Sequence, residues 1–294
     1  MIDASKLVGA IKSTRGGLIV DGHIVPLEDI GTLMLGNHTT ISGGALTMLA
    51  KYQVVLLNCQ WNGIPDLVGY SWSANTRVGA RHRAQAALSL PRTKAAWQAI
   101  VRAKIAGQAA NLAVAGLPGA ERLLRLCKET RSGDTTACEA QAARLYWASG
   151  IVGGQGFTRQ PGGADSPNSL LNYGYTVLRG AVIQGITAAG LWPTLGLWHR
   201  HRSNSHALAD DLIEPFRPAV DWAVHRLEPQ ASLDDQPAKR ALVGVVGLYL
   251  SEQAQTIYTE ISNLASQFGR YVEGAEAQLT VPSWIPPAEL TESD

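Results

Sequence analysis

The pattern of hydrophobic and polar positions changes once along this chain, near residue 75. Before that point, short apolar or β-branched runs separated by turn residues predict strands at residues 17–20, 23–27, 30–35, 54–59 and 66–72. Asp21-Gly22 is a strong signal for a two-residue hairpin turn. One helix interrupts the strands, with Ser42 as its N-cap and an apolar stripe that ends before Lys51. A small β-rich domain is therefore expected first.

After residue 75 strand signals almost vanish, and apolar residues recur at helical spacing. Helices are expected over residues 77–90, 92–115, 120–129, 136–147, 170–190, 216–226, 238–250 and 257–272. Thr135 or Thr136 is the expected cap of the fourth helix. The glycine-rich residues 149–168 predict a long loop, and the proline-rich tail from Pro282 predicts an extended segment. The expected fold class is α+β, with a β-domain at 1–74 and a larger all-α domain at 75–294.

Composition places the chain among folded globular proteins, with 46% hydrophobic and 17% charged residues in 294. It contains no run of 18 apolar residues, and its first residues lack the layout of a signal peptide. We therefore expect a cytoplasmic protein with no membrane partner. The three cysteines form no C-x-x-C pair, which argues against a disulfide framework or a thiolate zinc site.

Charge is segregated along the chain although the formal net charge is only +1. Residues 77–131 hold eleven Lys or Arg against two Asp or Glu, whereas residues 132–294 hold ten against seventeen. A basic block beside an acidic one indicates a phosphate-binding surface next to a carboxylate-rich metal site. A solvated basic helix face without a ligand is the alternative.

The chemistry concentrates in residues 195–218, where three histidines and three carboxylates are flanked by arginines. Imidazole and carboxylate groups suit Mn²⁺ or Mg²⁺, and a bound dication stabilises the charge that develops at an attacked phosphodiester. Asp211 and Glu214 also fit a variant of the helix capping box, which is the structural alternative. A zinc hydrolase using His199, His201 and His206 is a further alternative, although that spacing is unfamiliar for zinc. The glycine-rich loop lacks the spacing of a P-loop.

Four ordered motifs carry a resemblance to a known family. They are Glu139-Ala-x-Ala-Ala-Arg-x-Tyr-Trp147, Leu171-Asn-Tyr-Gly-Tyr-x-Val-Leu-Arg179, Leu195-Gly-Leu-x-His199 and Leu208-Ala-Asp-Asp-Leu-Ile-Glu-Pro-Phe-Arg-Pro218. Together they resemble the CRISPR-associated integrases of the Cas1 family, most of all those from type II systems. The resemblance covers nearly the whole chain. Trp198 departs from it, because close relatives often carry a further histidine there.

The resemblance implies a metal site of one Glu, one His and one Asp or Glu, which fall on Glu139, His199 and Glu214. These would be the catalytic residues, holding Mg²⁺ or Mn²⁺, with Asp211 as a supporting group one helical turn before Glu214. His201 and His206 do not match the ligand position, and we interpret them as phosphate contacts or exposed residues. The implied reaction is DNA integration, in which the 3′-hydroxyl of a captured fragment attacks a phosphodiester at a CRISPR repeat border.

The basic block then becomes the expected track for double-stranded DNA. Candidate phosphate contacts are Arg77, Arg81, Arg83, Arg92, Lys94 and Lys104. If all six bind phosphates, log affinity should fall with log salt with a slope of roughly −5. The resemblance also implies a homodimer formed through the β-domain and a complex with the Cas2 protein. A non-catalytic DNA-binding architectural subunit with the same fold remains the alternative function.

Overall fold

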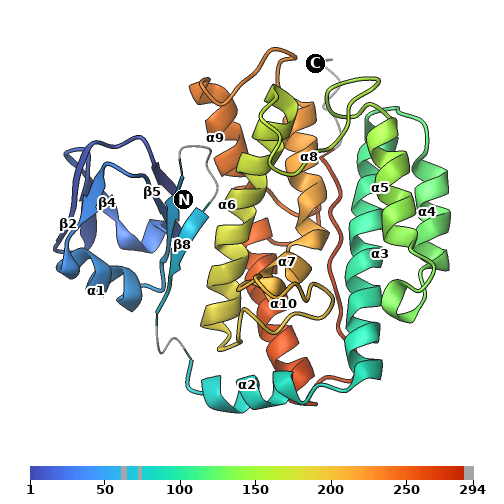
Figure 1. The fold of residues 1–294 in the computed structure, drawn as a ribbon, viewed down its shortest axis with the longest axis horizontal. Helices are drawn as coiled ribbons and strands as arrows, with labels where there is room; N and C mark the ends of the chain where they lie inside the picture. The colour runs from blue at the N-terminus through green and yellow to red at the C-terminus, as the bar shows by residue number, and fades with distance from the viewer. Residues whose placement is uncertain (61–64, 72–74, 288–294) are drawn as a thin grey trace.

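The computed structural model describes residues 1–60, 65–71 and 75–287, and within them the strands precede residue 70 while long helices follow (Figure 1). The α+β fold class is therefore confirmed. The expected domain boundary at residue 74 falls outside the described residues. The strands are β1 (Ile2–Ala4), β2 (Gly9–Thr14), β3 (Gly17–Val20), β4 (His23–Pro26), β5 (Thr32–Leu35), β6 (Thr39–Ile41), β7 (Val55–Cys59) and β8 (Pro65–Gly69).

These strands form two four-stranded sheets, ordered β1-β5-β7-β8 and β4-β3-β2-β6. The expected hairpin joins β3 to β4, and Asp21 (φ 49°) and Gly22 (φ 75°) both adopt the positive φ that its turn requires. Helix α1 (Gly43–Lys51) begins as expected, because the Ser42 hydroxyl accepts a hydrogen bond from the Ala45 N–H at 3.2 Å. Strands β1, β2 and β6 were not predicted.

The helical part is built around two long helices, α3 and α6 (Figure 1). The α-helices are α2 (Val78–Ala86), α3 (Leu90–Val114), α4 (Ala120–Glu129), α5 (Cys138–Ala148), α6 (Ser166–Ala188), α7 (Ala207–Leu212), α8 (Arg217–His225), α9 (Gln236–Gly244) and α10 (Ile257–Val272). Short 3₁₀ helices cover Leu27–Asp29, Ser132–Asp134, Glu214–Phe216 and Val245–Gly247.

The predicted starts of α5 and α6 need correction, and the helix expected over residues 238–250 ends at Gly244, followed by a 3₁₀ turn. Neither Thr135 nor Thr136 caps α5, whose N-cap Ala137 is in the left-handed conformation. The carboxylate of Asp134 takes that role by accepting the N–H groups of Cys138 (2.8 Å) and Glu139 (3.0 Å). Helix α6 begins four residues before the expected residue 170, because Asp165 caps it and accepts from the Asn168 N–H.

Helix α6 packs against β5 and β7 of the first sheet and so joins the two parts of the molecule (Figure 1). The absence of a side chain at Gly180 lets this helix approach Thr32 and Leu57 of the first sheet. The Tyr173 hydroxyl donates to Asp3 at 2.7 Å, and the Gln184 amide donates to the Gln53 carbonyl at 2.9 Å. The β-rich part is thus packed directly against α6, which has more buried residues than the other long helix, α3.

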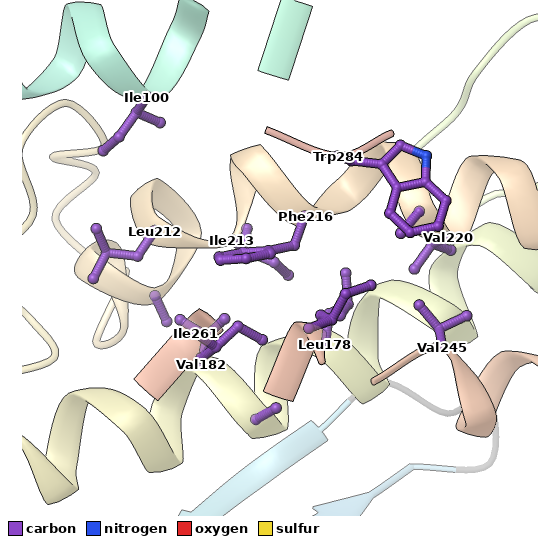
Figure 2. Close-up of a cluster of buried hydrophobic side chains, with 14 of the residues drawn as sticks. Ile100, Leu178, Val182, Leu212, Ile213, Phe216, Val220, Val245, Ile261 and Trp284 are labelled. Carbon is purple, nitrogen blue, oxygen red and sulfur yellow. The ribbon is translucent and has the colours of Figure 1, made fainter. Parts of the chain in front are cut away.

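The core of the helical part surrounds the segment that carries the central histidine and carboxylate motif. Figure 2 shows Leu212, Ile213 and Phe216 between side chains of α3, such as Ile100, and side chains of α6, such as Val182. The extended segment after α10 runs alongside α3 (Figure 1), and its Trp284 indole donates to the Asn111 side chain at 2.8 Å. Among the described residues, no helix combines the length and hydrophobicity needed to span a bilayer.

Candidate active site

The buried carboxylate of Asp211 organises the loop that presents His199. Asp211 lies in the last turn of α7 and is fully buried. It accepts hydrogen bonds from the backbone N–H groups of Leu197, Trp198 and His199, and it pairs with the His199 ring at Nδ1, 2.8 Å away. This pairing fixes the ring orientation and leaves Nε2 for a ligand. The hydrogen bond that Asp211 accepts from the His199 ring also raises the pKa of His199, against the opposing effect of burial.

Glu214 owes its position to the apolar residues on either side of it. Ile213 and Phe216 are buried in the core, so Glu214, which lies between them in the chain, is only 3% exposed. The guanidinium of Arg217 donates to Glu214 Oε1 at 2.8 Å. Burial would raise the pKa of Glu214, but the positive charges of Arg217 and Lys104 outweigh it and lower the pKa to about 2. Glu214 is therefore an anion throughout the physiological pH range.

Lys104 of α3 connects Glu214 with the predicted third ligand, Glu139. Its ammonium lies 2.7 Å from Glu139 Oε1 and 2.6 Å from Glu214 Oε2. Burial opposes the charge of Lys104, but the two carboxylates prevail and raise its pKa. The ammonium approaches Glu214 Oε2 outside hydrogen-bond geometry, so this buried oxygen accepts no hydrogen bond among the described residues. Glu214 consequently keeps a lone pair available for a further ligand.

A hollow of about 230 Å³ opens beside these groups. It is lined by Tyr175, Thr176, Arg179, His199, Asp210, Ile213, Glu214 and Arg217. Arg179 pairs with Asp210 at 2.9 Å, and Arg217 lies over the Tyr175 ring at 4.1 Å from its centroid. The hollow therefore combines two anchored guanidinium groups with two carboxylates and an imidazole, a set that can bind a phosphate or a cation.

The predicted ligands are only partly assembled in this arrangement. His199 and Glu214 line the same hollow, whereas Glu139 reaches Glu214 through Lys104. Within the described ranges, no three His, Cys, Asp or Glu side chains lie close enough to bind one metal ion. The residues nevertheless fit a hard divalent ion: none of the described residues donates a hydrogen bond to Glu214 Oε2, and the orientation of His199 is fixed by Asp211. The capping-box alternative is wrong, because Asp211 lies in the last turn of helix α7 rather than at the start of a helix.

His201 and His206 do not gather with His199. The His201 ring bonds to Ser203 and the His206 ring to Ser205, each at 2.8 Å. His201 is exposed, and burial lowers the pKa of His206. These separate local contacts give the three-histidine zinc alternative no support.

Sequence reasoning missed three side chains of the site. Lys104 was assigned to the DNA track, and no role was predicted for Arg217 or Arg179. The signal for Arg217 was its position three residues after Glu214, a spacing that places both side chains on one helical face. Trp198, the noted departure from the family pattern, stacks on buried Trp97 with ring centroids 5.6 Å apart. Trp97 also meets the His199 ring edge at 5.9 Å, so the two tryptophans support the histidine loop.

The six proposed DNA contacts differ in whether their positive charges are already paired within the protein. Arg77 and Arg81 both pair with Glu273, and Arg92 donates to the backbone carbonyls of Tyr271 and Glu276. Lys104 lies inside the site, which argues against its assignment as a surface phosphate contact. Arg83 and Lys94 have no ion-pair or hydrogen-bond partner for their side chains in the part of the chain that the structure describes.

We therefore expect Arg83 and Lys94 to dominate the salt dependence contributed by this set. Replacing both by alanine should reduce the slope of log affinity against log salt by roughly 2, since each phosphate contact contributes about 0.9. Fluorescence anisotropy with a labelled duplex, recorded between roughly 50 and 200 mM salt, measures this slope. The Arg77→Ala and Arg81→Ala pair should change it less, and a larger change from that pair would contradict the assignment.

Taken together, the fold and the site define a class of protein: a β-rich part joined to a helical part, whose site combines the buried Glu214 with the partly exposed His199 and Arg217, a set that can bind a phosphate or a cation. The family model described as CRISPR associated protein Cas1 matches residues 20–262. The chain is 37% identical over 274 residues to a CRISPR-associated endonuclease Cas1 of Neisseria meningitidis serogroup C, covering 90% of this chain and 89% of the relative. The chain belongs to the Cas1 family.

Solved structures of low sequence identity share this fold. A casposase bound to integration product matches with a TM-score of 0.78 at 19% identity, covering 100% of this chain and 96% of the other. A CAS1 protein from Thermotoga maritima matches with a TM-score of 0.72 at 17% identity, over 92% of this chain and 96% of the other. These likenesses extend over both parts of the molecule.

Proposed function

We propose that this protein is a CRISPR adaptation integrase, which inserts captured DNA fragments into the repeat array by attack of a 3′-hydroxyl on a phosphodiester. The observation that carries the proposal is the hollow lined by His199 and Glu214 in a chain of the Cas1 family. A relative sharing 37% identity is named an endonuclease, and a structural neighbour is a casposase bound to integration product. Cleavage and strand joining both act on a phosphodiester.

The residues support a reaction without a covalent protein intermediate. Tyr175 is the hydroxyl-bearing aromatic residue of the hollow, but its hydroxyl donates to the buried carboxylate of Asp221, and burial raises its pKa. It is therefore a poor nucleophile, and the attacking oxygen comes from DNA. Arg179 and Arg217 offer guanidinium groups that would hold the phosphate and offset its charge.

We propose Glu139, His199 and Glu214 as the residues that hold a divalent cation, Mg²⁺ or Mn²⁺, with Asp211 orienting His199. When bound, such an ion supplies a Lewis acid that stabilises charge on the phosphoryl oxygens. Carboxylate oxygens and one imidazole nitrogen are donors that these ions accept. Membership of a family named for endonucleases supports dependence on a divalent metal in general, and the hard oxygen donors favour these two ions.

We further propose double-stranded DNA, a second copy of the chain and a Cas2 protein as partners. Neighbours of this fold include a Cas1 protein in complex with DNA and a partial Cas6-RT-Cas1–Cas2 complex, at TM-scores of 0.57 and 0.60. Dimerisation through the β-rich domain, set at residues 1–74, is supported by its exposed apolar side chains, among them Val8 at 79% and Ile24 at 67% exposure.

A strand-joining assay tests the proposed function. Purified protein and a Cas2 partner are incubated with short duplexes and a supercoiled plasmid bearing a repeat, in Mn²⁺, Mg²⁺, Zn²⁺ or EDTA. We expect joining in Mn²⁺ or Mg²⁺ and none in EDTA. Glu139→Ala and His199→Ala should abolish joining while retaining duplex binding. Equal joining in EDTA would refute the metal-dependent function, and DNA compaction without joining in any metal would favour the architectural alternative.

A further inference from the structure

The ammonium of Lys104 occupies the place where two proposed metal ligands meet. Glu139 comes from α5 and Glu214 from the 3₁₀ helix after α7, so α3 supplies the cation that links two distant segments. The Lys104 side chain is 12% exposed, and the carboxylate side chains of Glu139 and Glu214 are 24% and 4% exposed. Two carboxylates held this close in partial burial repel each other unless a cation lies between them.

From this geometry we propose that Lys104 is a displaceable internal cation that keeps Glu139 and Glu214 together in the metal-free protein and competes with the divalent ion for them. The inference rests on the proposed function, since it concerns the same ligands. It goes further by assigning a positioning role to a residue that belongs to neither the predicted ligand set nor an exposed DNA surface.

Size and charge both indicate that a divalent ion would replace the Lys104 ammonium rather than bind beside it. The ammonium sits 2.6–2.7 Å from the carboxylate oxygens, whereas Mg²⁺ holds oxygen ligands at about 2.0–2.1 Å. Carboxylates drawn in to that distance leave no space for an ammonium between them. Lys104 forms a close ion pair with Glu214 Oε2 at 2.6 Å. Arg217 holds the other oxygen of Glu214, so the carboxylate stays anchored when Lys104 withdraws.

Metal binding to DNA-free protein tests the competition. Calorimetric titration with Mn²⁺ at constant ionic strength should give a dissociation constant about tenfold lower for Lys104→Gln than for wild type, since the competing charge is gone. In EDTA the same variant should melt at a lower temperature than wild type. Lys104→Arg keeps the charge and should bind Mn²⁺ no more tightly than wild type. Lys128→Gln, at an exposed lysine of α4, is the matched control and should leave the Mn²⁺ affinity unchanged.

A second measurement needs no substitution. Brief acetylation of folded wild type, followed by peptide mass spectrometry, should label Lys104 faster in Mn²⁺ than in EDTA, with Lys128 as the internal reference. Equal labelling in both conditions, or an unchanged or weaker Mn²⁺ affinity in Lys104→Gln, would overturn the inference. Glu214→Gln distinguishes a failure of the proposed metal site from a failure of the competition by Lys104. If this variant binds Mn²⁺ as tightly as wild type, the proposed metal site itself is wrong. If it abolishes binding and Lys104→Gln binds no tighter, only the competition fails.

Discussion

Glu214→Gln should abolish metal-dependent strand joining, with a loss of about three orders of magnitude or more, because it removes the anionic oxygen that accepts no hydrogen bond from the described residues. The change is nearly isosteric, so the surrounding core of Ile213 and Phe216 should stay packed. Rates of joining with a short duplex and a repeat-bearing target, measured at saturating Mn²⁺, give the loss directly. Duplex binding should be retained, since Glu214 is buried and its own charge opposes phosphate binding.

The same substitution should also destabilise the protein, by about 2–4 kcal/mol, because Lys104 and Arg217 lose the charge that compensates them. Urea unfolding at neutral pH measures this loss. Glu121→Gln is the control, since this carboxylate is exposed and makes only a long 3.9 Å contact with Arg125. Its stability and joining rate should match wild type. A loss of joining in Glu121→Gln comparable to that of Glu214→Gln would refute a specific role for Glu214.

The stability difference should depend on pH in a defined direction. The pKa of Glu214 is lowered from an ordinary 4.5 to about 2, so its ionised form stabilises the folded state above pH 4.5. That contribution is lost as pH falls from 4.5 towards 2. The difference in melting temperature between wild type and Glu214→Gln should therefore be largest at about pH 6 and smaller at about pH 3. A gap that widens on acidification would contradict the ion-pair explanation.

Local patterns were sufficient where an element is defined by its own residues. Helix α10 has the bounds that its apolar repeat predicts, and the turn at Asp21-Gly22 follows from the tolerance of those residues for positive φ. Strands β1 and β6, three residues each, carry no such signal, because their pairing depends on partners about thirty residues away. The cap of α5 was mispredicted for a related reason: Asp134 acts from outside the usual cap position.

The site shows the same limit at the level of single side chains. His199 and Glu214 belong to motifs close in sequence, and the structure brings both to one hollow. Lys104 was assigned to the basic surface because residues 77–131 are rich in positive charge. Its actual partners lie 35 and 110 positions further along the chain, on elements whose packing against α3 no local pattern specifies. From sequence alone, a long and flexible lysine side chain is expected to be exposed. Only the tertiary fold shows the buried carboxylates that pair with it.

Asp211→Asn should reduce joining by about 10–100-fold, because Asp211 orients His199 without being a predicted ligand. Its carboxylate accepts three backbone N–H groups of residues 197–199 and holds the ring of His199 at Nδ1. An asparagine cannot accept all of these hydrogen bonds, since one of its terminal atoms is a donor. The loop should loosen and the ring should lose its fixed orientation. Calorimetric Mn²⁺ titration and single-turnover joining rates measure the two consequences separately.

Asp210→Asn is the control, because it removes the same negative charge one residue earlier in the chain. Asp210 pairs with Arg179 and accepts from Asn204, so its loss changes the charge near the hollow without releasing the backbone of residues 197–199. The Mn²⁺ affinity should therefore fall more in Asp211→Asn than in Asp210→Asn. Equal losses in the two variants would mean that net charge matters and the orientation of His199 does not. A loss of Mn²⁺ affinity in Asp211→Asn alone would show that metal binding depends on this buried carboxylate, which holds the loop in place and orients the imidazole of His199.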